Sequence, residues 1–165
     1  PVPTGTVGEI VHRSPHATLG YWKNDDKTAE AFRNGWFHSG DLGVIDDEGY
    51  LSVVDRKKDM IKTGGENVAS REIEEVIFAH PAVSEVAVFG VPHPKWIEAV
   101  MAVVVARPGE TVEADAVIAY CREKLAGYKA PKLVEVIDQL PKNASGKVLK
   151  RDLRIRFADR AQTLG

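Results

Sequence analysis

The chain has 165 residues, of which 44% are apolar and 28% charged, as is typical of a globular protein. A net charge of −2 gives no reason to expect nucleic acid as a partner. The longest apolar run, residues 99–106, is too short to span a bilayer, and the one cysteine, Cys121, cannot form an intrachain disulfide, so we expect no transmembrane segment and a reducing, cytoplasmic location.

Residues 1–54 predict only short elements. Residues 8–12 and 50–54 have the pattern of strands, and residues 46–49 predict a hairpin turn before the second of them. Residues 25–32 predict a short helix with Asp25 or Asp26 as its N-cap. Elements of this size bury little apolar surface, so we expect them to be the edge of a larger domain.

The rest of the chain predicts a better-built α+β domain. Ser70 is the expected N-cap of a helix, and strands are expected over residues 83–89, 99–106 and 133–137. Two further helices are expected over residues 113–126, with Cys121 on the apolar face, and over residues 148–161. The fold class is therefore a small sheet with a hairpin, flanked by helices. The basic residues of the last helix are expected to form a solvated face: Lys150, Arg151, Arg154 and Arg156.

Two stretches combine basic residues with glycine. Residues 55–61 read Asp-Arg-Lys-Lys-Asp-Met-Ile and lead through Lys62 into Gly64-Gly65, a pair that can adopt φ values closed to other residues. Residues 141–147 form a second such loop, ending in Ser145-Gly146-Lys147. A charged hinge followed by a ligand loop is one interpretation of the first stretch, and a polar hairpin with a glycine turn is the other.

Several motifs in order give the chain a family resemblance. They are the aromatic-x-Ser/Thr-Gly-Asp element at residues 36–41, the stretch at 55–61, the loop at 64–68, and the closing elements at 127–131 and 140–147. Together they resemble the C-terminal part of the ATP-dependent adenylate-forming (AMP-binding) enzymes, and among these the fatty-acid–CoA ligase-like acyl-CoA synthetases most. The resemblance covers essentially the whole chain, with Ser39 where the family usually has threonine.

The resemblance implies a division of the chain into three parts. Residues 1–54 would be the end of the large N-terminal AMP-binding domain, residues 55–59 the hinge, and residues 60–165 the mobile C-terminal lid domain. The phosphate loop and acyl pocket lie upstream in family members and are not in this sequence. We therefore expect this chain alone to be inactive.

The resemblance also assigns roles to Asp41, Arg56 and Lys58. A carboxylate at Asp41 would bind the ribose hydroxyls of ATP, Arg56 would contact the nucleotide, and Lys58 would be the hinge residue. The Arg56 guanidinium suits contact with the nucleotide because it can donate hydrogen bonds to two oxygens at once. The local pattern leaves simpler alternatives open, namely a turn-capping aspartate, an ion pair of Arg56 with Asp55 or Asp59, and an ordinary exposed lysine.

Lys147 is the predicted catalytic residue. The resemblance implies that it binds ATP and bridges the α-phosphate and substrate carboxylate, where its charge would stabilise the developing negative charge. Gly64 and Gly65 would let the CoA arm pass close to the backbone, with Lys62 as a weaker CoA-binding candidate. From the local sequence alone, Lys147 could equally be one of the tail's solvated cations.

The implied parent enzyme joins a carboxylic acid, expected to be a fatty acid, to CoA. It would use ATP and Mg²⁺ to form acyl-AMP and pyrophosphate, and then form the thioester after the lid rotates. The partners are the acid, CoA and the N-terminal domain of the same enzyme, with self-association of this chain through exposed strand edges. No histidine shows metal-ligand spacing. The alternatives are a free-standing non-catalytic interaction domain, or an enzyme that loads a carrier-protein thiol.

Overall fold

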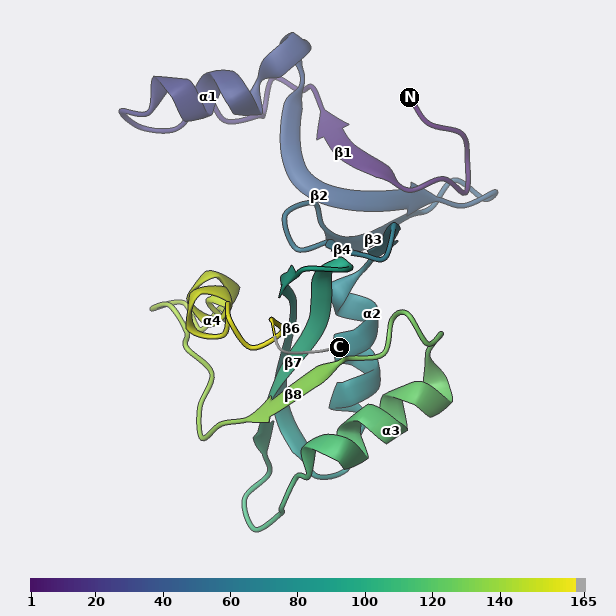
Figure 1. Ribbon diagram of the computed structural model, residues 1–165. Helices are drawn as coiled ribbons and strands as arrows, with labels where there is room; N and C mark the ends of the chain where they lie inside the picture. Colours follow the sequence, from purple (N-terminus) through teal and green to yellow (C-terminus); the bar gives the residue numbers. More distant parts are fainter. Residues whose placement is uncertain (163–165) are drawn as a thin grey trace. The chain divides into compact units, whose positions relative to one another are not determined.

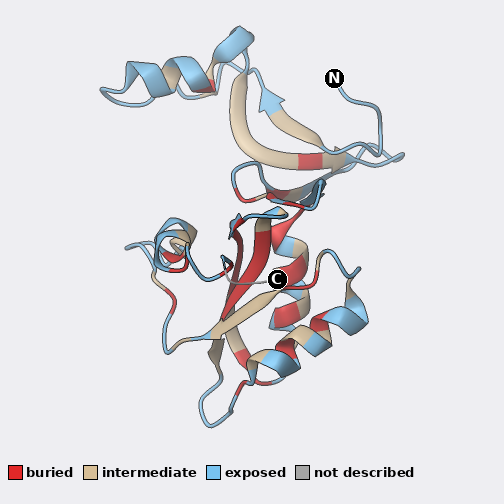
Figure 2. Ribbon diagram, viewed as in Figure 1, coloured by how far each residue is buried: buried red, intermediate tan, exposed pale blue. Residues whose placement is uncertain are grey.

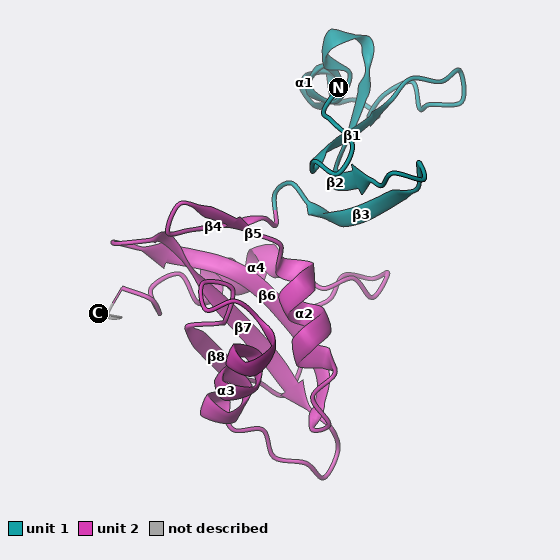
Figure 3. Ribbon diagram, turned by 90° about the vertical axis from the view of Figure 1, so that its right-hand side faces the viewer, with its two compact units in different colours: residues 1–58 teal, residues 59–165 magenta. Residues whose placement is uncertain are grey.

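The computed structural model describes residues 1–162, and the chain divides into two compact units between Lys58 and Asp59 (Figure 3). The first unit is Pro1–Lys58, and the second is formed by the residues that follow.

The first unit is a three-stranded antiparallel sheet with one short helix. Its strands pair in the order β1 (Gly8–His12), β2 (Phe37–Ile45) and β3 (Leu51–Arg56). Helix α1 (Asp25–Ala31) and a 3-10 turn (Arg33–Gly35) connect β1 to β2. Of the apolar residues in 1–58, all of which the structure describes, only Ala31 is buried (Figure 2). The prediction that this part buries little core is confirmed.

The second unit contains a five-stranded mixed sheet. Strands β4 (Ile61–Thr63), β5 (Glu66–Val68), β6 (Val83–His93) and β7 (Ile97–Ala106) pair in the antiparallel order β5-β4-β7-β6. Strand β8 (Leu133–Val136) joins β7 in parallel. A long β6–β7 hairpin beside a parallel strand that is reached through a helix matches the predicted α+β class.

Helices cover both faces of this sheet (Figure 1). Helices α2 (Ser70–Phe78) and α3 (Ala114–Lys124) pack on one face, against Val88, Val100 and Ala102, while α4 (Lys150–Arg156) packs on the other, against Phe89 and Met101. Successive strand residues point to opposite faces, so a strand covered on both sides must be apolar throughout. This explains the unbroken apolar run in β7.

Burial also settles the role of the single cysteine. Cys121 is fully buried on α3, and burial raises the pKa of its thiol to about 11. A thiol with such a pKa forms almost no nucleophilic thiolate at neutral pH. Cys121 is therefore a core residue, as its helical position predicted.

Several helix ends differ from the prediction, and α4 ends at Arg156 rather than near residue 161. Asn24, rather than Asp25 or Asp26, caps α1 by accepting a hydrogen bond from Lys27 N at 3.1 Å. Ser70 is the first residue of α2 and is buried, so it is not the N-cap. Helix α4 begins at Lys150 because Val148 pairs with Lys142 in an isolated bridge, which holds the chain extended there.

Candidate functional site

Asp41 and Arg56 lie opposite each other on β2 and β3. The guanidinium Nε of Arg56 is 3.4 Å from Asp41 Oδ1, and the two side chains are 56% and 35% exposed. The structure thus pairs the Arg56 side chain with Asp41, while Asp59, which the local pattern also offered, pairs with Arg154. An ion pair this exposed contributes about 1 kcal/mol or less. A ligand with hydroxyl and phosphate oxygens could therefore replace it at little cost.

Ser39 and Gly40 fix the backbone that presents Asp41. The Ser39 hydroxyl donates to Ile10 O at 2.8 Å and accepts a hydrogen bond from Asp41 N at 3.0 Å. Gly40 has φ +76°, a left-handed conformation that favours glycine, and its carbonyl accepts from Lys57 N at 2.8 Å. Both contacts of Ser39 need only a hydroxyl, so serine can replace the family's threonine here.

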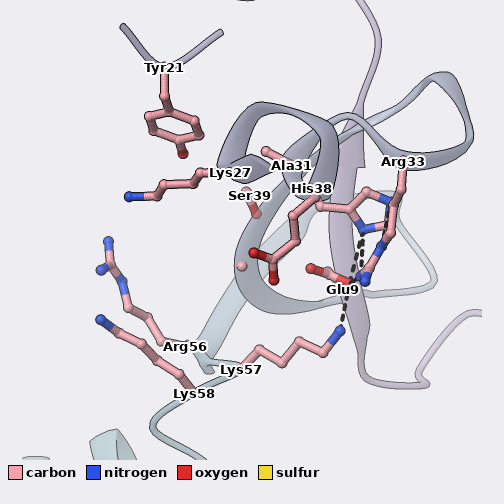
Figure 4. Close-up of a pocket in the computed structure, with 12 residues that line it drawn as sticks. Glu9, Tyr21, Lys27, Ala31, Arg33, His38, Ser39, Arg56, Lys57 and Lys58 are labelled. Atoms are coloured by element: carbon pink, nitrogen blue, oxygen red, sulfur yellow. Dashed lines mark hydrogen bonds and ion pairs between the residues drawn. The ribbon is translucent and has the colours of Figure 1, made fainter. Parts of the chain in front are cut away.

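A cavity of about 450 Å³ lies beside this pair, within the first unit. Figure 4 shows the side chains of Arg56 and Lys58 extending into the space that Tyr21 and Lys27 border. Lysine and arginine head groups that share one open cavity favour an anionic ligand. The lining residues are Glu9, Tyr21, Lys27, Glu30, Ala31, Arg33, His38, Ser39, Gly40, Arg56, Lys57 and Lys58.

Glu9 is a site residue that the sequence did not reveal. Its Oε2 accepts a hydrogen bond from Lys57 Nζ at 2.9 Å and from Arg33 Nη2 at 3.1 Å, and His38 Nδ1 lies 3.1 Å from it (Figure 4). The hydrogen bond from Lys57 lowers the pKa of Glu9 to about 2, helped by His38 and opposed by desolvation. Glu9 therefore connects β1 to the residue next to Lys58.

We expect Glu9→Gln to lower the stability of the first unit by about 1–3 kcal/mol at pH 7, because hydrogen bonds to a charged group are lost. The pKa of Glu9 is about 2 in the folded protein, and its ordinary value is 4.5. The extra stability of the wild type over Glu9→Gln should therefore be complete above pH 4.5 and decrease as the pH falls towards 2. Urea unfolding followed by fluorescence of Trp22 and Trp36, with Trp96→Phe in every protein compared so that only the first unit is observed, measures this. Glu30→Gln is the matched control, and an advantage that stays the same from pH 7 to pH 3 would show that Glu9 acts without its charge.

Gly64 and Gly65 form the two-residue turn between β4 and β5. Their φ angles are +59° and +89°, and Thr63 pairs with Glu66 across them. Positive φ at both central positions defines the hairpin turn that favours glycine. A Cβ at either glycine would meet nothing within 4 Å. Residues 61–68 therefore form a hairpin with a glycine turn, and because the space beside the turn is open, the ligand-loop interpretation of Gly64 and Gly65 stays a prediction.

Contacts with the β6–β7 hairpin hold this turn in place. Lys62 N donates to Glu98 Oε2 at 2.7 Å, and Gly64 N donates to Trp96 O at 3.0 Å. Trp96 stacks on His93 with ring centroids 4.1 Å apart. The Lys62 side chain is exposed. The glycine turn is therefore hydrogen-bonded to the β6–β7 hairpin while its outer side stays accessible.

Lys147 is exposed and lies in a tightly closed loop. Asn143 Oδ1 accepts hydrogen bonds from Ser145 N, Ser145 Oγ and Lys147 N at 3.1, 2.8 and 2.9 Å. The backbone adds Asn143 N to Lys147 O at 2.9 Å, and Gly146 takes φ +79°. Asn143 is the second residue that the sequence did not single out. Its side chain fixes the backbone from which Lys147 projects.

The predicted site residues thus fall into three sets. Asp41, Arg56 and Lys58 lie together in the first unit. In the second unit, Gly64 and Gly65 form one turn with Lys62 beside it on β4, and Lys147 occupies its own loop. Within residues 1–162, no group of three or more acidic, histidine or cysteine side chains could hold a metal ion, and no helix is long and apolar enough to cross a membrane.

A glycine turn and a lysine loop on a small two-sided sheet, together with a strand pair in the first unit that presents an aspartate and an arginine, form the arrangement that the family resemblance predicts. Residues 72–147 match the family described as AMP-binding enzyme C-terminal domain. These residues belong to that family, as the motifs of the chain indicated.

Curated relatives are similar along nearly the whole chain. A feruloyl-CoA synthase of Amycolatopsis is 50% identical over 95% of this chain and 32% of its own length. A long-chain-fatty-acid–CoA ligase of Escherichia coli O6:H1 is 49% identical over 93% of this chain and 27% of its own. The crystal structure of ATP-bound MatB from Rhodopseudomonas palustris is 42% identical, with a TM-score of 0.89 over 98% of this chain and 32% of that one. The chain therefore spans about a third of the length of these proteins.

Proposed function

We propose that this chain is the C-terminal part of an acyl-CoA synthetase. Residues 1–54 would end the large N-terminal AMP-binding domain, residues 55–59 would be the hinge, and residues 60–165 the lid. The division of the chain between Lys58 and Asp59, inside the proposed hinge, is the observation that carries this proposal. The relatives named as CoA synthase and CoA ligase support it, because each is about three times as long.

The surface of the first unit supports the proposed upstream domain. Leu19 and Trp22 are 101% and 88% exposed, and further apolar side chains of β2 and β3 are also open to solvent. Scattered exposed apolar residues are normal, but a small sheet with almost no core of its own needs a partner surface. We propose that the N-terminal domain supplies it. The other exposed apolar side chains of this unit include Ile45, Tyr50, Leu51 and Val53.

In the proposed adenylation step, the acid's carboxylate attacks the α-phosphate of ATP and pyrophosphate leaves. Asp41 would accept hydrogen bonds from the ribose hydroxyls, and Arg56 would bind a ribose or phosphate oxygen, each giving up the weak pair between them. The Lys147 ammonium would stabilise the charge that builds on the phosphate and carboxylate oxygens. A bound Mg²⁺ would neutralise phosphate charge, and we assign its ligands to the N-terminal domain.

In the proposed second step, the lid turns about Lys58 and the CoA thiolate displaces AMP from the acyl group. Lys147 would leave, and the Gly64-Gly65 turn would line the path of the CoA arm. Its open outer side and lack of side chains suit a ligand that passes close to the backbone. Lys62 beside it could attract the CoA phosphates. Two half-reactions that share one site give a physical reason for a hinge.

The proposed acid is a fatty acid. Relatives named for feruloyl and for long-chain fatty-acyl substrates are 50% and 49% identical to this chain, so identity does not separate these two acids. The residues that contact the acyl group would lie in the N-terminal domain. A cytoplasmic location remains part of the proposal, because Cys121 is a free buried thiol.

A thioester assay tests the proposal. The protein extended upstream to its natural start would be incubated with ATP, Mg²⁺ and CoA, and with hexadecanoate, ferulate or 2-succinylbenzoate in parallel. We expect acyl-CoA and AMP with at least one acid, and most with the fatty acid. Acyl-AMP formation that yields a thioester only with a phosphopantetheinyl carrier protein would favour carrier loading. No product with any acid would favour the non-catalytic alternative.

A further inference from the structure

The ion pair between Asp59 and Arg154 crosses the second unit from its first residue to its last described helix. Asp59 follows directly after the proposed hinge residue Lys58, and Arg154 lies on α4. Arg154 Nη2 is 3.0 Å from Asp59 Oδ1, and the two side chains are 30% and 12% exposed. A carboxylate buried to this extent needs a partner, since removing one group strands the other charge away from water. Arg154 is therefore paired with a carboxylate. The prediction that it belongs to a solvated helix face is wrong.

The other side of α4 is fixed by the core. Leu153 and Phe157 pack against Phe89, Met101 and Leu140 on the face of the sheet opposite α2 and α3. An amphipathic helix held by apolar contacts can still slide or rotate, because such contacts are not directional. The Asp59–Arg154 pair adds a directional contact at one point of this helix.

A second polar contact fixes the start of α4. Lys150 Nζ is 2.8 Å from Glu74 Oε1 and 2.8 Å from Ser70 Oγ, both on α2. Lys150 is the first residue of α4 and stands three residues after Lys147. Two points of this short helix, its first residue and its fifth, are thus tied to the domain body by cations that the sequence analysis had assigned to a solvated face.

We propose that Asp59 and Arg154 are positioning residues that couple the hinge to the loop of Lys147. They would hold α4, and through it residues 143–149, in a fixed place relative to Asp59, so that the loop moves with the hinge as one body. This inference rests on the proposed function. Neither residue touches the reacting atoms; both act through the placement of the Lys147 ammonium.

Hydrogen–deuterium exchange tests the structural half of this proposal on the present chain. We expect Arg154→Ala to speed amide exchange in residues 143–150 by about 10-fold or more, with exchange in β6 and β7 unchanged. Arg151→Ala, on the same helix and exposed, should match wild type. Arg154→Lys, which keeps the charge, should restore part of the protection. Unchanged exchange in residues 143–150, or an equal rise across the whole sheet, would overturn the proposal.

Kinetics of the extended protein test the functional half. We expect Arg154→Ala and Asp59→Asn each to lower kcat for acyl-AMP formation by about 10- to 100-fold with little change in the KM for ATP, because misplacement of a catalytic group costs rate more than binding. The double variant should be no slower than either single variant. Thioester formation from supplied acyl-AMP should change less than about 3-fold. Additive losses, or equal losses in both half-reactions, would contradict the coupling. A wild-type protein without adenylation activity would refute the proposed function instead, while the exchange result would still decide the structural role.

Discussion

Replacing Lys147 by alanine in the extended protein is expected to lower the rate of acyl-AMP formation by about 100- to 1,000-fold, the usual effect of removing one group that stabilises transition-state charge. The side chain is exposed, and the loop is closed by Asn143 and the backbone rather than by the lysine head group. The variant should therefore fold normally. Single-turnover measurement of acyl-AMP separates this step from thioester formation.

Two comparisons make the Lys147 result specific. Lys124→Ala removes an exposed lysine from α3, outside the proposed site, and should leave both half-reactions unchanged. Thioester formation by Lys147→Ala from supplied acyl-AMP should stay within about 3-fold of wild type, since the lysine is proposed to have left by then. Equal loss in both half-reactions would mean that Lys147 supports the fold or CoA binding instead.

Replacing Lys58 by proline is expected to lower thioester formation by about 10- to 100-fold while acyl-AMP formation falls much less. Proline locks its own φ near −65° and restricts the residue before it, here Lys57. A hinge whose dihedral angles must change between two half-reactions cannot do so with these angles fixed. Stopped-flow measurement of each half-reaction in the extended protein gives the two rates.

The matched change at the same position is Lys58→Ala, which removes the side chain but keeps the backbone free. It should retain most thioester activity if Lys58 acts as a hinge. If alanine is as damaging as proline, the ammonium that lines the cavity of the first unit matters more than the backbone. Wild-type rates for both steps in Lys58→Pro would exclude the hinge role.

Much of the second unit could be predicted because its information is local. The apolar run of β7, the periodic face of α2 and the paired glycines at Gly64 and Gly65 each specify one element through neighbouring residues. The motifs also placed Asp41 and Arg56 in one site, and the β2–β3 register sets them opposite each other. Two residues that are distant in the sequence can be predicted to lie opposite each other on paired strands only when the turn and the strand register are known.

Other residues could not be found because their partners lie far away in the sequence. Glu9 meets Lys57 across 48 positions, and Asp59 meets Arg154 across 95. A basic helix face such as that of α4 looks solvated until tertiary packing brings carboxylates to it. The start of α4 was missed for a different reason, since the local pairing of Val148 with Lys142 overrides helix propensity there.

The most direct test of the central claim is ATP–pyrophosphate exchange, measured in parallel on this chain and on the form extended upstream, with a panel of carboxylic acids. If residues 60–165 are the lid of an acyl-CoA synthetase, exchange should occur only in the extended form, and Lys147→Ala should abolish most of it. Exchange by this chain alone, free of contaminating ligase, or no exchange in either form with any acid, would contradict the account.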